Sequence, residues 1–153
     1  MRDFATARGV ALDVRRFASA TGTAAAAARA IGTEVPRIVK SLVFIADGRP
    51  VVVLCRGDNR VSVKRLADVL RARSVRRATA DEAKVHTGYP IGGVPPFAHE
   101  RVLEVVADET LARFDTVWAA AGLPDAVFEI SVADLRRLAG ARSAAIAAVP
   151  GME

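Results

Sequence analysis

Residues 42–55 read LVFIADGRPVVVLC, two apolar runs separated by a turn sequence. The runs 42–45 and 51–55 are rich in β-branched residues, which favour strands, and the Asp-Gly-Arg-Pro segment 47–50 is typical of a turn. Two strands joined so closely form an antiparallel hairpin. Because both runs are apolar on both faces, we predict that this hairpin lies in the middle of a sheet covered on both sides.

The rest of the chain predicts helices and short strands around this hairpin. The expected helices, placed by capping residues and stop signals, cover residues 1–9, 24–31 (capped by Thr21 or Thr23), 36–39, 64–71, 79–87 (opened by a capping box of Thr79 and Glu82) and 131–140. The expected further strands cover residues 10–17 at a sheet edge, 61–63, 75–78, 102–107, 116–119 and 126–130. Hairpins mixed among helices predict an α+β fold, a single domain over residues 1–153 with a mixed, mostly antiparallel sheet and flanking helices.

Composition and charge narrow the class of protein. A chain of 153 residues with 52% hydrophobic and 25% charged residues is long enough for one folded domain with its own core. Lys plus Arg number 22 against 17 for Asp plus Glu, which gives a formal net charge of +5. This excess favours a polyanionic partner, and a solvated basic surface is the alternative.

Several classes of protein are disfavoured by what the sequence lacks. Cys55 is the single cysteine, so we expect no intrachain disulfide, and with only His86 and His99 beside it we expect no Cys/His metal site. We find no motif for a catalytic serine elbow, a phosphate-binding loop or a dinucleotide, and we expect no cofactor. The N-terminus does not resemble a signal peptide, and the longest uncharged apolar run, 21–28, is too short for a bilayer, so we expect a cytoplasmic protein without a membrane partner.

The segment 88–99, GYPIGGVPPFAH, holds three of the eleven glycines and three of the seven prolines of the chain. Such a composition excludes a helix interior or a central strand and predicts a shaped loop. Gly92 and Gly93 can take a positive φ and let a ligand approach the backbone, while Pro95 and Pro96 fix two φ angles. We interpret the loop as a preorganised binding wall; a tight crossover between sheet elements is the alternative.

A few polar side chains are candidates for chemistry. Lys40 precedes the first apolar run in register with Leu42 and Phe44, so it points toward the interior or a pocket mouth if that face is buried; a solvated lysine is the alternative. His99 could position a substrate or decorate the surface, and Cys55, inside an apolar run, is interpreted as a buried inert thiol. A basic group that could hold phosphates surrounds the turn after residue 55: Arg56, Arg60, Lys64 and Arg65.

Five segments together carry a resemblance to a known family. They are 23–28 (TAAAAA), 38–42 (IVKSL), 57–60 (GDNR), 87–96 (TGYPIGGVPP) and 120–122 (AAG). In this order and spacing, over residues 20–145, they resemble the YbaK/ProX family of aminoacyl-tRNA deacylases, which is related to the editing domain inserted in bacterial prolyl-tRNA synthetases. No synthetase catalytic core accompanies them, so the chain is similar to the freestanding, trans-acting members.

The resemblance implies a hydrolase that removes a wrong amino acid from the terminal adenosine of a tRNA, most often the tRNA for proline, by attack of water and without an acyl-enzyme. Lys40, Gly92 and Gly93 would be catalytic. The implied substrate-binding residues are Thr23, Val94, Pro95, Pro96, His99, Ala120 and Gly122. The implied partners are the acceptor end of an aminoacyl-tRNA and a prolyl-tRNA synthetase, and not DNA.

Two positions depart from the family pattern. The family usually has glycine where this chain has Ala98, and a methyl group there could restrict φ or tighten the loop. In some members a small hydroxyl residue or glycine stands at the position of Ala120, which affects the amino acid that is removed; a small one such as cysteine or alanine is expected. These departures motivate an alternative function, a non-catalytic module that binds tRNA, a small ligand or a protein.

Overall fold

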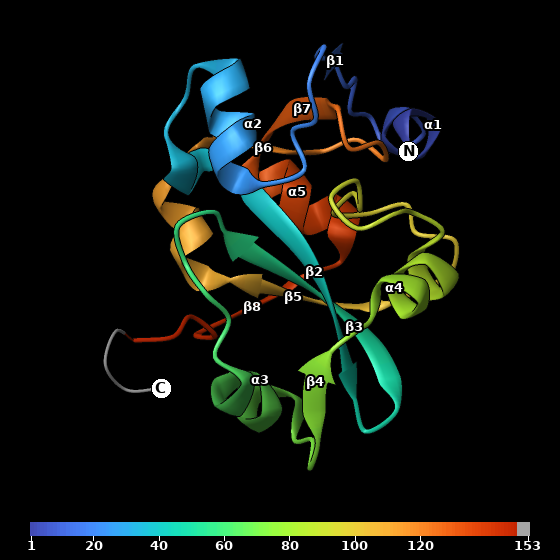
Figure 1. The fold of residues 1–153 in the computed structure, drawn as a ribbon, viewed down its shortest axis with the longest axis vertical. Coiled ribbons are helices and arrows are strands. Elements are labelled where there is room, and N and C mark those ends of the chain that lie inside the picture. Colours follow the sequence, from blue (N-terminus) through green and yellow to red (C-terminus); the bar gives the residue numbers. More distant parts are fainter. Residues whose placement is uncertain (150–153) are drawn as a thin grey trace.

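The computed structural model describes residues 1–149 and contains two β-sheets with helices around them (Figure 1). The α-helices are α1 (Arg2–Thr6), α2 (Ala24–Ile31), α3 (Val63–Leu70), α4 (Ala80–Thr87) and α5 (Val132–Ala139). The 3-10 helices are η1 (Val35–Arg37) and η2 (Glu109–Arg113). The strands are β1 (Val14–Arg16), β2 (Val39–Ala46), β3 (Arg49–Arg56), β4 (Val75–Arg77), β5 (Glu104–Asp108), β6 (Thr116–Ala120), β7 (Ala126–Ser131) and β8 (Arg142–Ala144).

The predicted hairpin forms β2 and β3, which lie inside a five-stranded sheet of order β4-β2-β3-β5-β8. The second sheet has three strands in the order β1-β7-β6. The β3–β5 and β5–β8 pairs are parallel and the other pairs are antiparallel. The predicted α+β fold with a mixed, mostly antiparallel arrangement is therefore confirmed. Its division between two sheets was not predicted, because it depends on pairing between distant segments.

Both faces of the β2–β3 hairpin are buried, as its apolar sequence predicts. On one face Leu54 packs in a cluster with Phe128 of β7 and Leu135 of α5. On the other face Val53 packs in a cluster with Leu66 of α3. Burial of such side chains stabilises the fold by about 1.5 to 3 kcal/mol each, so the hairpin is a rigid support for whatever lies at its ends.

The helix boundaries follow local signals in the sequence. The Thr23 hydroxyl accepts a hydrogen bond from the N–H of Ala26, and α2 ends at Gly32 with φ of 85°. The predicted capping box of Thr79 and Glu82 opens α4, with both of its reciprocal hydrogen bonds present. A good cap contributes about 1 kcal/mol to a helix, and the bonding groups are close in sequence. Such features can therefore be predicted without knowledge of the fold.

Several predicted elements differ from the structure. The predicted strand 10–17 is reduced to Val14–Arg16, and Val39, predicted to end a short helix over 36–39, begins β2 because the chain is already extended after η1. The first helix ends at Thr6 and not at Gly9. Residues 61–63 do not form a strand, because Ser62 caps α3 and leaves Val61 with a single bridge to Ala147. Strand β8, absent from the prediction, is polar and exposed along most of its three residues and has no apolar pattern. In the part of the chain that the structure describes, no helix has both the length and the hydrophobicity needed to cross a membrane.

Candidate active site

A pocket of about 290 Å³ lies where the first half of β2 meets the start of α2, the loop 88–99 and β6. An isolated parallel bridge between Ile38 and Trp118 brings the start of β2 next to β6, so this pocket sits between the two sheets. The sequence-predicted residues that line it are Thr23, Lys40, Gly92, Val94 and Ala120. The structure thus brings together residues from four segments of the chain.

Lys40 lies at the second position of β2, half-buried, and lines the pocket. Its Nζ donates a hydrogen bond of 2.5 Å to the main-chain carbonyl of Asn59. This placement agrees with the interior or pocket-mouth orientation suggested by the period of two. Among residues 1–149, Lys40 and Arg77 are the only charged side chains lining the pocket, and no Asp, Glu, His or Cys of this range lines it. The pocket is therefore electropositive and suits a ligand that carries or develops negative charge.

The start of α2 and the strand β2 supply polar groups to the pocket. Thr23 uses its oxygen to cap α2, which leaves its O–H free to donate toward the pocket. Ser41 lines the pocket, and its Oγ is buried with no hydrogen-bond partner within residues 1–149. The carbonyl of Val43 accepts from the N–H of Ala78, so by the period of two the main-chain groups of Ser41 face the same edge, beyond the end of β4. That edge offers a ligand both a main-chain donor and a main-chain acceptor.

Gly92 forms the lip of the loop 88–99 against a second glycine. Its φ is +86°, and an added Cβ would come within 3.3 Å of the Cα of Gly22. Gly22 also lines the pocket, so two glycine backbones close one side of it. The N–H of Gly93, by contrast, donates to the carbonyl of Pro90 and is occupied within the loop. Gly93 lies so close to the main chain of Leu123 that an added Cβ would come within 3.0 Å of it. This close packing holds the loop against the β6–β7 turn.

The remaining predicted loop residues lie behind the pocket wall and do not line it. Pro95 and Pro96 are buried, and the Nε2 of His99 donates to the carbonyl of Pro95 over 2.7 Å. Burial lowers the pKa of His99, and its hydrogen bond to Pro95 offsets this only in part. Phe97 is fully buried and stacks on Phe4 with ring centroids 5.6 Å apart. These contacts anchor the loop. Gly122, at φ of +97°, packs against the ring of Tyr89, which also belongs to the loop.

Ala98 adopts a left-handed conformation with φ of 61°, so its methyl group does not keep the loop out of this conformation. Glycine takes this conformation without the steric penalty of a Cβ. We expect Ala98→Gly to raise the free energy of unfolding by about 0.5 to 1 kcal/mol, as measured by urea denaturation. A lower free energy of unfolding would mean that packing of the methyl group against the core outweighs the strain.

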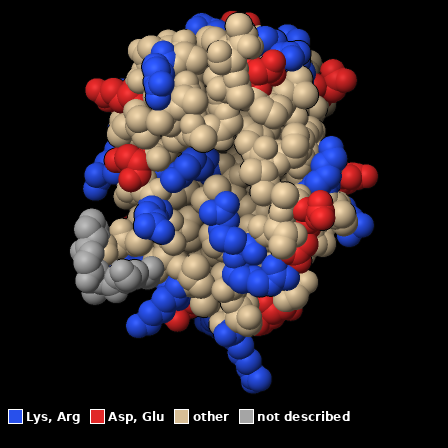
Figure 2. Space-filling model, viewed as in Figure 1, with Lys and Arg blue, Asp and Glu red and all other residues tan. Residues whose placement is uncertain are grey.

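The four basic residues predicted to hold phosphates do not line the pocket. Arg56 forms a fork with Asp58, with Nε 2.6 Å from Oδ1, and its side chain is only 14% exposed. Arg60 and Lys64 are exposed, and Arg65 is half-buried. Figure 2 shows Lys and Arg side chains over the middle and lower part of the face that carries α3 and β4, with Asp and Glu mostly toward its edges. Arg56, Arg60, Lys64 and Arg65 therefore belong to the basic surface outside the pocket, whereas Lys40 and Arg77 line the pocket itself.

Cys55 is fully buried opposite Lys40 in the β2–β3 ladder. Burial raises the pKa of its thiol to about 11, and the nearby positive charge of Lys40 lowers it by a smaller amount. A thiol protonated at neutral pH is a poor nucleophile. The interpretation of Cys55 as an inert core residue is consistent with this environment.

Several residues that line the pocket were not predicted as site residues, among them Gly22, Ser41 and Arg77. Gly22 lies between two threonines just before a predicted cap, a weak signal for a close approach of two backbones. Ser41 directly follows Lys40 and would have been assigned to the other face of a regular strand. Arg77 reaches the pocket because β4 pairs with β2 and places Arg77 opposite Phe44. Its guanidinium lies 5.5 Å from the ring centre of Phe44. No local pattern reveals that pairing.

Comparison with known proteins agrees with this architecture. Residues 18–138 match the family model described as "Aminoacyl-tRNA editing domain". The chain is 33% identical to "Uncharacterized protein YwhH" of Bacillus subtilis over 124 residues, 80% of this chain and 78% of that protein. It is 43% identical over 89 residues to the "Proline--tRNA ligase" of Lactobacillus gasseri, covering 58% of this chain and only 16% of the ligase.

A solved structure described as a candidate trans-editing enzyme for prolyl tRNA synthetase superposes with a TM-score of 0.90 and 36% identity, over 97% of this chain and 94% of that one. The fold and the electropositive pocket thus define an α+β domain of the editing class. The chain belongs to the aminoacyl-tRNA editing domain family. This membership confirms the resemblance found in the sequence, while the chain spans only about a sixth of the length of the proline--tRNA ligases that it matches.

Proposed function

We propose that the protein is a trans-editing deacylase that hydrolyses the ester of a mischarged tRNA, with the tRNA for proline carrying a small amino acid as its substrate. The whole chain serves as one editing domain in the cytoplasm, with a prolyl-tRNA synthetase as the source of the mischarged tRNA. The observation that carries this proposal is the pocket itself, where Lys40 and Gly92 lie beside polar groups and, among residues 1–149, no carboxylic acid, histidine or cysteine.

The proposed reaction uses water and no covalent enzyme intermediate. The oxygen of a water bonds to the ester carbonyl carbon, and the carbonyl oxygen takes up the negative charge. Collapse of this intermediate breaks the bond to the ribose oxygen, which takes up the proton lost by the water and leaves with the tRNA. Lys40 stabilises the oxyanion, since a preorganised cation in a partly dry pocket lowers the barrier for charge development. Its hydrogen bond to Asn59 leaves two N–H groups for this purpose.

Other groups of the pocket position the substrate. The edge of β2 at Ser41 and the hydroxyl of Thr23 can bind the amino group and the ribose, because both line the same pocket as Lys40 and Gly92. The part of the wall formed by β6 consists of Ala119 and Ala120 beside Trp118. Small side chains there set the size of the amino acid that fits. Holding an already activated ester in this geometry can account for a large part of the rate.

A deacylation panel tests the proposal. The tRNA for proline is charged separately with cysteine, alanine, serine and proline, and the release of each amino acid is followed under single-turnover conditions. We expect the protein to hydrolyse at least one of the wrong esters faster than the ester of proline. Binding of these tRNAs without hydrolysis of any would favour the non-catalytic alternative instead.

Binding of the tRNA should depend on salt. The exposed Arg77 forms no ion pair within residues 1–149 and lies at the pocket, so it is placed to meet a phosphate near the acceptor end, with Arg60, Lys64 and Arg65 further along the tRNA. We expect Arg77→Ala to reduce the log–log salt slope of tRNA affinity by about 0.7, the value for one phosphate of a single strand.

The matched control is Arg142→Ala. Arg142 lies on β8, at the opposite edge of the five-stranded sheet from β4, and forms an ion pair with Glu104 of β5. This variant should keep the slope of the unmodified protein. A slope near zero for the unmodified protein in a fluorescence titration would count against a polyanionic substrate altogether.

A further inference from the structure

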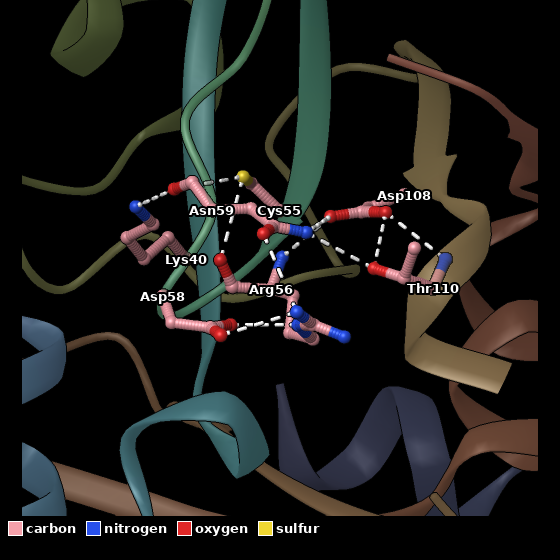
Figure 3. Close-up of polar contacts among 7 residues, drawn as sticks. All are labelled: Lys40, Cys55, Arg56, Asp58, Asn59, Asp108 and Thr110. Atoms are coloured by element: carbon pink, nitrogen blue, oxygen red, sulfur yellow. Dashed lines mark hydrogen bonds and ion pairs between the residues drawn. The ribbon is translucent and has the colours of Figure 1, made fainter. Parts of the chain in front are cut away.

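A buried carboxylate stands at the end of β5, outside the pocket. Asp108 is 1% exposed, and its four hydrogen-bond donors are all uncharged (Figure 3). They are the N–H of Arg56 at 3.2 Å, the Nδ2 of Asn59 at 2.9 Å, and the N–H and hydroxyl of Thr110 at 3.0 and 2.7 Å. Burial alone would raise the pKa of Asp108, but the hydrogen bonds from Asn59 and Thr110 outweigh it and hold the pKa below the usual value. The carboxylate is therefore charged at neutral pH.

These hydrogen bonds hold the turn that follows β3. Strands β3 and β5 are parallel neighbours, so the end of β5 lies beside the point where the chain leaves β3. Asp108 accepts one bond from the main chain of Arg56, at the start of the turn, and one from the side chain of Asn59, three residues later. The turn is closed by the N–H of Asn59, which donates to the carbonyl of Arg56 over 2.8 Å. Both ends of the turn are thus fixed to one carboxylate.

The same turn carries the oxygen that receives Lys40. The main-chain carbonyl of Asn59 accepts the Lys40 ammonium, and Figure 3 shows this contact on the far side of Asn59 from Asp108. The turn also packs closely onto η1, because a Cβ at Gly57 would overlap the carbonyl oxygen of Val35. A continuous path of contacts therefore runs from Asp108 through Asn59 to the lysine of the pocket.

A lysine needs such support more than most side chains. Its ammonium sits on a flexible four-carbon stem, and ordering that stem costs about 1.5 to 2 kcal/mol of rotamer entropy. One fixed acceptor restricts the ammonium to a single region of the pocket wall. If the acceptor shifts, the ammonium can leave the position in which it meets the carbonyl oxygen of the substrate.

We propose that Asp108 is a positioning residue for Lys40: it holds the Asn59 turn, and through the Asn59 carbonyl it keeps the lysine ammonium at its place in the pocket. This inference deepens the proposed function and rests on it, because it assigns to Lys40 the role in hydrolysis given above. It differs from a purely structural role, in which Asp108 would stabilise the fold without affecting the lysine.

Spectroscopy tests the contact independently of activity. The chain has only Lys40, Lys64 and Lys84 as lysines, so ¹⁵N-lysine labelling gives a simple spectrum of side-chain ammonium groups. We expect slow proton exchange for Lys40 in the unmodified protein and fast exchange in Asp108→Asn and in Asn59→Ala, two variants that cut the path at different points. Asp47→Asn is the matched control, because Asp47 also holds a turn by accepting from main-chain N–H groups, those of Arg73 and Ser74. That control should keep the slow exchange.

Kinetics supply the second readout. On an ester that the unmodified protein hydrolyses, we expect both path variants to lower kcat about tenfold or more with KM changed less than about twofold, because misplacement of a catalytic group affects the reaction step. The Asp47→Asn control should retain kcat. If the unmodified protein hydrolyses an ester and the path variants retain kcat or the slow exchange of Lys40, the inference is wrong and the proposed function stands. If no ester is hydrolysed at all, the proposed function fails, and the exchange measurement alone decides whether Asp108 holds Lys40.

Discussion

Lys40→Ala lowers the rate of ester hydrolysis by about a hundredfold or more if Lys40 stabilises the oxyanion, since loss of one preorganised donor to an oxyanion typically has this effect. The variant should still fold, because the side chain is half-buried and its hydrogen bond to Asn59, the one it makes within residues 1–149, contributes about 1.5 to 3 kcal/mol. The measurement is single-turnover release of the amino acid from a mischarged tRNA, with circular dichroism to check the fold.

The matched control for this prediction is Lys84→Ala. Lys84 also donates to a main-chain carbonyl, that of Gly88, but it is exposed on α4 and does not line the pocket. Removal of the Lys84 side chain should change the rate of ester hydrolysis by less than about twofold. Equal losses in the two variants would indicate a general effect of removing positive charge and would contradict a specific role for Lys40.

Gly92→Ala is the second change with a large expected effect. The alanine would have to adopt a φ near +86°, which strains it, and its Cβ would press on the Cα of Gly22 at 3.3 Å, a contact of two backbones that neither can relieve by rotating a side chain. The loop must then move away from the pocket wall. A displacement on the order of 1 Å at a reacting group can cost about a hundredfold in rate, so we expect kcat/KM to fall by ten- to about a hundredfold.

Gly48→Ala separates the two causes of that loss. Gly48 has φ of +80°, close to that of Gly92, but an added Cβ there would meet nothing within 4 Å. This control should lose about 1 kcal/mol of stability from strain and keep its activity. If Gly92→Ala retained full activity, the close approach of Gly92 to Gly22 would have no part in shaping the site.

Much of the fold could be predicted because its signals are local. The β2–β3 hairpin, the Thr23 cap and the capping box at Thr79 each depend on residues close in sequence. The separation into two sheets and the addition of β8 depend on partners far apart in the chain, for which the sequence of each strand carries little information. The resemblance to a family then supplied the fold as a whole, and the comparisons confirm it.

The site, like the fold, has one part that local sequence signals predict and another part that depends on distant segments. The period of two along β2 placed Lys40 toward the interior, and the glycines and prolines of residues 88–99 identified the loop that forms the facing wall. The contacts that complete the site join distant segments: Gly22 to Gly92, and Asp108 to the turn that holds Lys40. Neither pair has a spacing or composition that marks it. Such contacts become visible only when the strands are placed in three dimensions.

The most direct test of the account is the rate at which the unmodified protein and Lys40→Ala release alanine and cysteine from the tRNA for proline, compared with release of proline from the same tRNA. The account predicts rapid release of at least one of the two wrong amino acids, slow release of proline, and loss of the rapid reaction in Lys40→Ala. Equal rates for all three esters, or unchanged rates in the variant, would contradict it.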